Sequence, residues 1–173
     1  DLSSPSSTHF PVVTGSVSHK GLPELQQVRR GLFIGTQRAA NEKQLLEAMG
    51  ITHILSMNGS APLWPQGFQY HTVSTNDDDS TKLLQNMVMG VRFVREALDS
   101  GGNVLMHCLH GVNRSGAMLI GYLMMDEELS YEEALEAART VRPCISPRAG
   151  MVKQLHLWED ILRRSVLSAP FPQ

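Results

Sequence analysis

The sequence predicts an α/β domain in which a central, mainly parallel sheet is flanked by helices. Short apolar or β-branched runs alternate along the chain with longer segments that repeat apolar residues at i, i+3 and i+4. Strands that alternate with helices in this way are typical of an α/β domain. No internal repeat interrupts the order, and 173 residues are enough for one compact domain with a single core.

Four segments have the composition of strands. The first, 27–35, ends in an apolar run bounded by glycine, and the second, 51–57, is rich in β-branched residues. The fourth, 103–106, is a short apolar run that suits a buried strand of a parallel sheet. A stretch with glycine and two prolines, 58–67, predicts a loop before the third. The predicted strands are 27–35, 51–57, 68–74 and 103–106.

Five segments have helical patterns. One over 42–49 ends at Gly50, which can adopt the left-handed conformation, and a nearly apolar one over 116–125 is expected at the centre of the domain. The capping box formed by Ser130 and Glu133 predicts the start of a helix that runs through residue 138. Two amphipathic helices complete the set, with inner faces formed by Leu83, Leu84, Met87, Val88, Val91, Val94 and Leu98, and by Met151, Leu155, Trp158, Ile161 and Leu162.

The ends of the chain differ from its middle. Residues 1–20 are rich in Ser, Thr, Pro and Gly with little apolar periodicity, which is the composition of a flexible tail. We therefore expect one domain over residues 25–165, between an N-terminal tail of residues 1–24 and a C-terminal tail of residues 166–173.

Composition narrows the class of protein. Fifteen basic and seventeen acidic side chains give a formal net charge of -2, which argues against nucleic acid as a partner. Two cysteines, Cys108 and Cys144, are too few for a disulfide framework, and a thiol needed as a thiolate suits the cytosol or the nucleus. The sequence has no apolar run that approaches the roughly 18 residues of a membrane span, so a soluble domain without membrane attachment is expected.

The chemistry concentrates in the run His107-Cys108-Leu109-His110-Gly111-Val112-Asn113-Arg114-Ser115. A predicted strand enters this run and a predicted helix leaves it, so the loop between them forms an anion site at a helix N-terminus. If Gly111 allows a tight turn, the backbone N–H groups of residues 109–114 can point inward at one phosphate. Leu109, His110, Gly111, Val112, Asn113 and Arg114 are therefore the predicted substrate-binding residues.

Cys108 is the predicted nucleophile of a phosphate-monoester hydrolase. An isolated cysteine is usually a small buried hydrophobe, but here histidine precedes it and glycine, arginine and serine follow at fixed positions. A helix N-terminus and a nearby cation favour the thiolate, which is the reactive form. Arg114, six residues on, can hold two phosphoryl oxygens with its planar guanidinium.

This run resembles the signature His-Cys-x5-Arg-Ser/Thr of the protein tyrosine phosphatase superfamily, in its dual-specificity branch. Similar order and spacing extend over roughly residues 27 to 163. The resemblance implies a protein tyrosine phosphatase-like fold and a reaction in which Cys108 attacks phosphorus to form a phosphocysteine that water then cleaves. It implies phosphorylated proteins as substrates, on Tyr and on Ser or Thr, with a protein kinase as one possible target, and no cofactor or metal.

Such a reaction needs a proton donor opposite the loop. Asp77, Asp78 and Asp79 are the candidates, and an acidic turn or helix start is the structural alternative. Family members carry the acid sixteen residues before the position of Phe93, which selects Asp77 and leaves Asp78 in reserve. By the same resemblance Ser115 donates to the departing thiolate. His107 is expected to orient the loop and tune the thiolate.

The loop also departs from the commoner dual-specificity pattern. His110 and Asn113 resemble the loop of RNA 5′-triphosphatases of the same superfamily, which would need a basic channel; the candidates for it are Arg29, Arg30, Arg142 and Arg148. Leu109 and Val112 stand where phosphoinositide phosphatases tend to carry lysine, which argues against highly charged inositol substrates.

Three further alternatives stay open from the sequence. Arg148 stands where related sequences often have an asparagine that supports the acid, so it could meet a second phosphate, an acidic substrate residue or only solvent. Cys144 could be a redox partner of Cys108, although a packed thiol is the simpler interpretation. A phosphoprotein-binding pseudophosphatase is the alternative from another class, but the sequence retains the cysteine, the arginine and a candidate acid.

Overall fold

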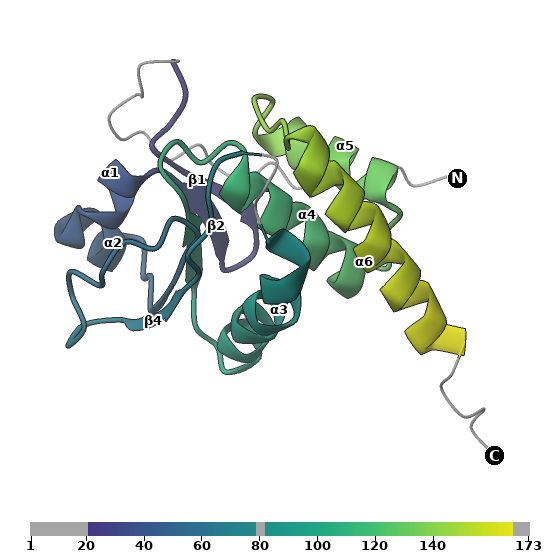
Figure 1. Cartoon of the computed structure of the whole chain (residues 1–173). Helices are drawn as coiled ribbons and strands as arrows, with labels where there is room; N and C mark the ends of the chain where they lie inside the picture. Colours follow the sequence, from purple (N-terminus) through teal and green to yellow (C-terminus); the bar gives the residue numbers. More distant parts are fainter. Residues whose placement is uncertain (1–20, 79–81, 168–173) are drawn as a thin grey trace, which may run out of the picture.

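A five-stranded sheet forms the centre of the molecule, seen in a computed structural model that describes residues 21–78 and 82–167 (Figure 1). Its strand order is β1-β2-β5-β3-β4. The pairs β2/β5, β5/β3 and β3/β4 are parallel, and only the edge strand β1 is antiparallel to its neighbour, which confirms the predicted mainly parallel sheet. The strands are β1 (Leu25–Arg29), β2 (Leu32–Gly35), β3 (His53–Ser56), β4 (Gln69–Thr72) and β5 (Val104–His107).

The prediction of a single strand over residues 27–35 is wrong. The segment is a hairpin in which β1 and β2 pair across a turn at Arg30 and Gly31. Gly31 has φ 75°, in the left-handed region that glycine adopts without steric cost. The apolar residues on both sides of the turn give the sequence a continuous strand-like appearance, although the chain reverses between them.

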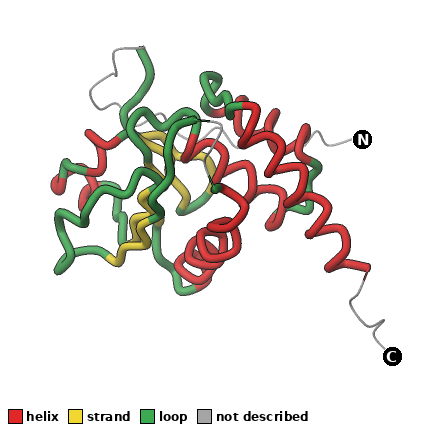
Figure 2. Tube along the Cα trace, viewed as in Figure 1, coloured by secondary structure: helices red, strands yellow, loops and turns green. Residues whose placement is uncertain are grey.

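Six helices in the described residues cover the two faces of the sheet (Figures 1 and 2). Two short helices pack with one face, where Phe33 and Leu105 point; the first is not predicted and the second is shorter than its prediction over 42–49. Four longer helices cover the other face, where Ile34 and Met106 of the sheet belong to the larger hydrophobic core. The bounds are α1 (Gln37–Ala40), α2 (Lys43–Ala48), α3 (Leu83–Asp99), α4 (Arg114–Asp126), α5 (Tyr131–Val141) and α6 (Ala149–Leu167).

Helix α4 is the central helix that its apolar sequence predicts. Its residues from Ser115 to Met124 are buried, and the Nε1 atom of Trp158 on α6 donates to the Gly121 carbonyl at 3.0 Å. The predicted capping box also forms, with Ser130 and Glu133 bonding reciprocally at the start of α5. Strand β5 and helix α4 therefore hold the loop between them in a well-packed setting.

Two residues predicted to lie on inner faces lie outside. Val88 of α3 is 48% exposed and Ile161 of α6 is 43% exposed. On α3 the buried face instead includes Gly90 and Ala97, and at Gly90 a methionine of α4 approaches closely. An apolar pattern alone favours the larger Val88 and overlooks the glycine.

Helices α3 and α4 approach each other through reciprocal glycine and methionine contacts. A Cβ atom on Gly90 of α3 would lie 2.6 Å from Cε of Met118 on α4, and a Cβ atom on Gly121 of α4 would overlap Met87 on α3. Each glycine thus accommodates the methionine of the facing helix. A side chain at either glycine would have to displace the flexible end of the facing methionine.

The folded part extends slightly beyond the predicted boundaries. Glu24 is buried and accepts a hydrogen bond from the Thr36 hydroxyl, while the Pro23 carbonyl accepts one from Arg142 at 2.8 Å. Helix α6 continues to Leu167, two residues past the expected end of the domain. Residues 1–20 and 168–173 of the predicted tails 1–24 and 166–173, and the candidate acid Asp79, lie outside the described residues. Within the described ranges no helix is both long and apolar enough to cross a membrane.

Candidate active site

The loop of residues 108–114, here named the phosphate loop, connects the carboxyl end of β5 to the first turn of α4. Cys108 is buried at 3% exposure, directly after His107 at the end of the strand. Its Sγ atom lies 3.2 Å from Oγ of Ser115, whose side chain is fully buried in the first turn of α4. The structure therefore brings the predicted nucleophile and the predicted hydroxyl donor into contact at a helix N-terminus.

Gly111 makes the tight turn of the phosphate loop possible. Its φ is 65°, and a Cβ atom at this position would lie 2.6 Å from the backbone oxygen of Gly35 at the end of β2. The neighbouring atoms belong to the backbone and cannot move aside as a flexible side chain could. Conformation and space both require glycine here.

Arg142 supports the phosphate loop from its buried side. Its guanidinium donates to the carbonyls of Gly111 at 2.7 Å and His110 at 3.2 Å, and also to Pro23. The side chain has no exposed surface, and burial lowers the pKa of Arg142. The prediction that Arg142 could line a basic channel is wrong, because its charge is directed into the protein.

His107 is buried behind the nucleophile. Burial, with the nearby Arg114 guanidinium acting in the same direction, lowers the pKa of His107 from 6.5 to about 4, so the ring is neutral at pH 7. Its Nδ1 atom lies 3.3 Å from the Cys108 carbonyl oxygen, which can only accept, so Nδ1 carries the ring proton in this contact. The ring thus contacts the backbone at the start of the phosphate loop, and its role in orienting the loop stays a prediction.

Arg114 connects the phosphate loop to the loop that carries the candidate acid. Its Nη1 atom donates to the Thr75 carbonyl at 3.0 Å, two residues before Asp77. The Nε atom of Arg114 is buried and has no hydrogen-bond partner in the described part of the chain. Leu109 and His110 are exposed at the rim, while Val112 is buried.

Asp77 lies in the acid loop, residues 75–78, and is tied to two other elements. The Nδ2 atom of Asn113 lies 3.2 Å from Oδ1 and 3.4 Å from Oδ2 of Asp77. The Nε atom of Arg148, at the start of α6, donates to Oδ1 at 3.1 Å. Asp78 is exposed, and Asp77 contacts the phosphate loop through Asn113.

Two residues that the sequence left open acquire partners in this way. Asn113, one of the two residues behind the resemblance to RNA phosphatases, donates from its side-chain amide to Asp77. Arg148 contacts the candidate acid from a position where related sequences often have an asparagine that supports the acid. Nothing in the local pattern could reveal these contacts, because the partners lie 36 and 71 residues apart in the chain.

Cys144 is half-buried beside the Arg142 guanidinium, whose pKa it raises against the larger effect of burial. Both cysteines are free thiols. In the described ranges no group of three or more His, Cys, Asp and Glu side chains is arranged to hold a metal ion.

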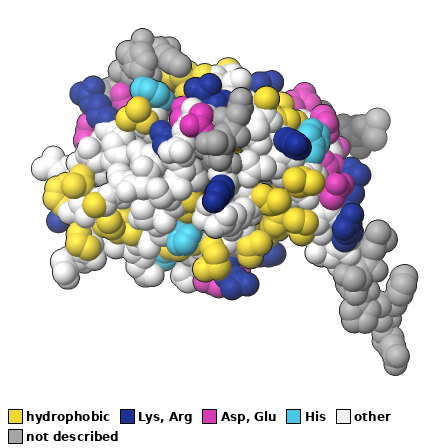
Figure 3. Space-filling model, in the orientation of Figure 1, with side chains coloured by type: hydrophobic (Ala, Val, Ile, Leu, Met, Phe, Trp, Pro, Cys, Tyr) yellow, Lys and Arg dark blue, Asp and Glu magenta, His cyan; other side chains and the backbone are white. Residues whose placement is uncertain are grey.

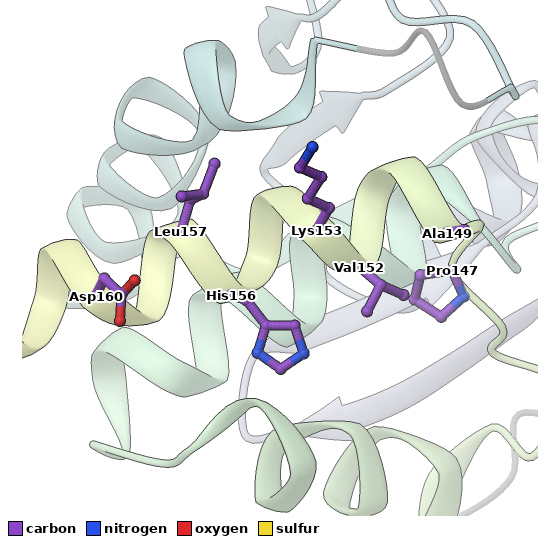
Figure 4. Close-up of a pocket in the computed structure, with 7 residues that line it drawn as sticks. All are labelled: Pro147, Ala149, Val152, Lys153, His156, Leu157 and Asp160. Carbon is purple, nitrogen blue, oxygen red and sulfur yellow. The ribbon is translucent and has the colours of Figure 1, made fainter.

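A shallow groove on the outer surface of α6 lies next to this site (Figure 4). Pro147 and Ala149, the neighbours of Arg148, form one end, and the groove continues along the helix to Asp160. Lys153 and Leu157 project from the helix on one side, and His156 projects on the other (Figure 4). Lys153 lies on α6, which begins directly after Arg148, and makes none of the contacts to Asp77 described above.

Comparisons with known proteins agree with the fold and the motif. The family model described as the dual specificity phosphatase catalytic domain matches residues 32–161. Dual specificity protein phosphatase 1B of Arabidopsis thaliana is 33% identical over 145 residues, which cover 83% of this chain and 87% of that protein. Dual specificity protein phosphatase 1 of the same species is 36% identical over 139 residues, covering 80% and 70%.

Solved structures are similar as well. Human DUSP28 has a TM-score of 0.75 and 30% identity, and the match covers 82% of this chain and 96% of that one. The human tyrosine phosphatase-like serine/threonine/tyrosine-interacting protein has a TM-score of 0.74 and 32% identity, covering 79% and 96%. The residues that the family model matches, 32–161, include strands β2 to β5 and the phosphate loop.

Proposed function

The chain belongs to the dual specificity phosphatase family and is an enzyme of that family, and from this premise we propose that it hydrolyses phosphotyrosine and phosphoserine or phosphothreonine in proteins through a phosphocysteine on Cys108. The observation that carries the proposal is the contact between Cys108 and Ser115 at the buried start of α4, with Arg114 in the same loop. A helix N-terminus with a guanidinium in the same loop is suited to bind the phosphoryl group that the cysteine attacks.

In the first step the Cys108 sulfur attacks phosphorus, the S–P bond forms and the P–O bond to the leaving group breaks. Asp77 gives its proton to the departing oxygen. Arg114 stabilises the transferring phosphoryl group, and its buried Nε atom is a donor that a phosphoryl oxygen can accept from. The backbone of Leu109, His110, Gly111, Val112 and Asn113 supplies the remaining donors.

In the second step water attacks the phosphocysteine and the S–P bond breaks. Asp77, now a carboxylate, takes the proton from water. The Ser115 hydroxyl, 3.2 Å from the sulfur, donates a hydrogen bond to the departing thiolate. Both steps balance with water as the only second substrate, so the proposal needs no metal and no cofactor.

Phosphorylated proteins are a better match than RNA for this site. Two features that suggested RNA have other partners, since Asn113 contacts Asp77 and Arg142 is buried beneath the phosphate loop. On the visible face Lys and Arg side chains stand at separate places (Figure 3). A reactive thiolate also suits a reducing compartment, so we propose the cytosol or the nucleus as the location.

One preparation of the full chain tests the proposal against three substrates: a phosphotyrosine peptide, a phosphothreonine peptide and 5′-triphosphate RNA. We expect kcat/KM to be highest for a phosphopeptide, and a higher value for RNA would refute the protein assignment. Cys108→Ser is expected to abolish turnover and retain affinity for inorganic phosphate. Turnover in this variant would place the nucleophile elsewhere, and a wild-type protein that binds phosphopeptide without turnover would be a pseudophosphatase.

A further inference from the structure

The carboxylate of Asp77 receives its donors unevenly. Oδ1 accepts from Arg148 Nε at 3.1 Å and lies 3.2 Å from Asn113 Nδ2, whereas the contact from Asn113 to Oδ2 is 3.4 Å. These donors come from the start of α6 and from the phosphate loop. The two oxygens of one carboxylate are therefore held differently by two separate elements.

An oxygen that already accepts two N–H donors is a poor site for a proton, since an acid O–H would point into those donors. We propose that Arg148, together with Asn113, is a positioning residue that fixes Oδ1 of Asp77 and leaves Oδ2 as the oxygen that carries the transferred proton. The inference rests on the proposed phosphatase reaction and adds to it the atom of the acid and the residue that orients it.

The contact from Arg148 uses Nε, the guanidinium nitrogen that is separated from Cα by the fewest bonds. Because Nε2 of glutamine is separated from Cα by the same number of bonds, Arg148→Gln keeps a donor at that position and removes the charge. Methionine has a similar length and no donor. The pair of variants separates a hydrogen bond that orients the acid from a general effect of positive charge.

The orientation of a general acid matters most for substrates whose leaving group departs slowly unless its oxygen is protonated. We therefore expect Arg148→Met to lower kcat for phenyl phosphate about 10-fold or more, and kcat for 4-nitrophenyl phosphate by less than about 3-fold, with KM unchanged. Arg148→Gln is expected to retain wild-type rates on both esters within about 3-fold. Lys153→Gln removes a positive charge from the same helix outside the site and serves as the matched control (Figure 4).

The experiment measures kcat and KM of wild type, Arg148→Met, Arg148→Gln, Lys153→Gln and Asp77→Asn on a series of aryl phosphates of increasing leaving-group pKa. A loss in Arg148→Met that grows along the series, with rescue in Arg148→Gln, supports the inference. An equal loss on every ester, or an Arg148→Gln variant as impaired as Arg148→Met, overturns it. An inactive wild type would refute the phosphatase function itself, and an Asp77→Asn variant without leaving-group dependence would refute the acid, so these failures are distinguishable.

Discussion

The Sγ atom of Cys108 and the Oγ atom of Ser115 lie 3.2 Å apart, and both side chains are buried. Ser115→Ala removes the donor to the thiolate when sulfur is the leaving group, so hydrolysis of the phosphocysteine is expected to slow. We expect kcat to fall about 10-fold to 100-fold while kcat/KM, which reports the first step, changes by less than about 3-fold. Stopped-flow mixing with 4-nitrophenyl phosphate would show a burst of product equal to the enzyme. Equal losses in both constants without a burst would contradict the assigned role.

The lowered pKa of His107 is expected to make the folded protein less stable in mild acid. Its pKa is 6.5 in an exposed setting and about 4 in the folded chain, so the unfolded chain binds the proton first as pH falls. The contribution of His107 to the free energy of unfolding is fully present above about pH 6.5 and is lost progressively down to about pH 4. Between about pH 7.5 and pH 5 the expected loss is about 2 kcal/mol. Urea unfolding at the two pH values measures the change.

A His107→Gln variant provides the control for this measurement. Burial also lowers the pKa values of His53 and His71, and those contributions remain in the variant. The difference between wild type and variant therefore isolates His107. If the two proteins lose the same stability over this range, the folded-state pKa of His107 is not depressed.

Gly111→Ala tests the turn of the phosphate loop. The new Cβ atom would meet the Gly35 oxygen at 2.6 Å, so the loop must move and the donors at Cys108 lose their arrangement. We expect at least about a 100-fold loss of kcat/KM. Gly101→Ala is the matched control, because Gly101 also has positive φ, 81°, but a Cβ atom there meets nothing within 4 Å. Comparable losses of activity in the two variants would show that backbone conformation, not contact with Gly35, is the cause.

Arg142→Met tests the support beneath the loop. It leaves the carbonyls of Gly111, His110 and Pro23 without their buried donor, and we expect unfolding free energy to fall by about 3 kcal/mol or more. Arg29→Met is the control, because Arg29 forms a partly exposed ion pair with Glu127 at 2.6 Å. That variant is expected to lose less than about 1 kcal/mol. Thermal unfolding of both proteins decides the point, and similar losses would mean that Arg142 contributes no more than a surface pair.

The sequence predicts most of the fold because its helices and strands have local signals. The stripe on α3, the apolar composition of α4 and the capping box at Ser130 each lie within one segment. The errors arise where a local pattern has two solutions. Residues 27–35 suit one strand or a hairpin, and Gly31 decides between them through its left-handed backbone.

The phosphate loop is predictable for the same reason, since Cys108, Gly111, Arg114 and Ser115 are neighbours in the chain. The residues that support it are not predictable. Arg142 reaches Gly111 across 31 positions, and Arg148 reaches Asp77 across 71. Whether an arginine is a surface cation or a buried donor depends on the packing of several elements, which no short segment encodes.

The reciprocal contacts of Gly90 with Met118 and Gly121 with Met87 have a consequence for how this enzyme can diversify. Helix α3 follows the acid loop and α4 follows the phosphate loop, so these contacts join the two helices that come after the proposed proton donor and nucleophile. A larger side chain at either glycine would displace the flexible end of the facing methionine, so a substitution there requires repacking of the core. New substrate preferences are therefore expected first at exposed rim positions such as Leu109 and His110, where a substitution requires no repacking of the core.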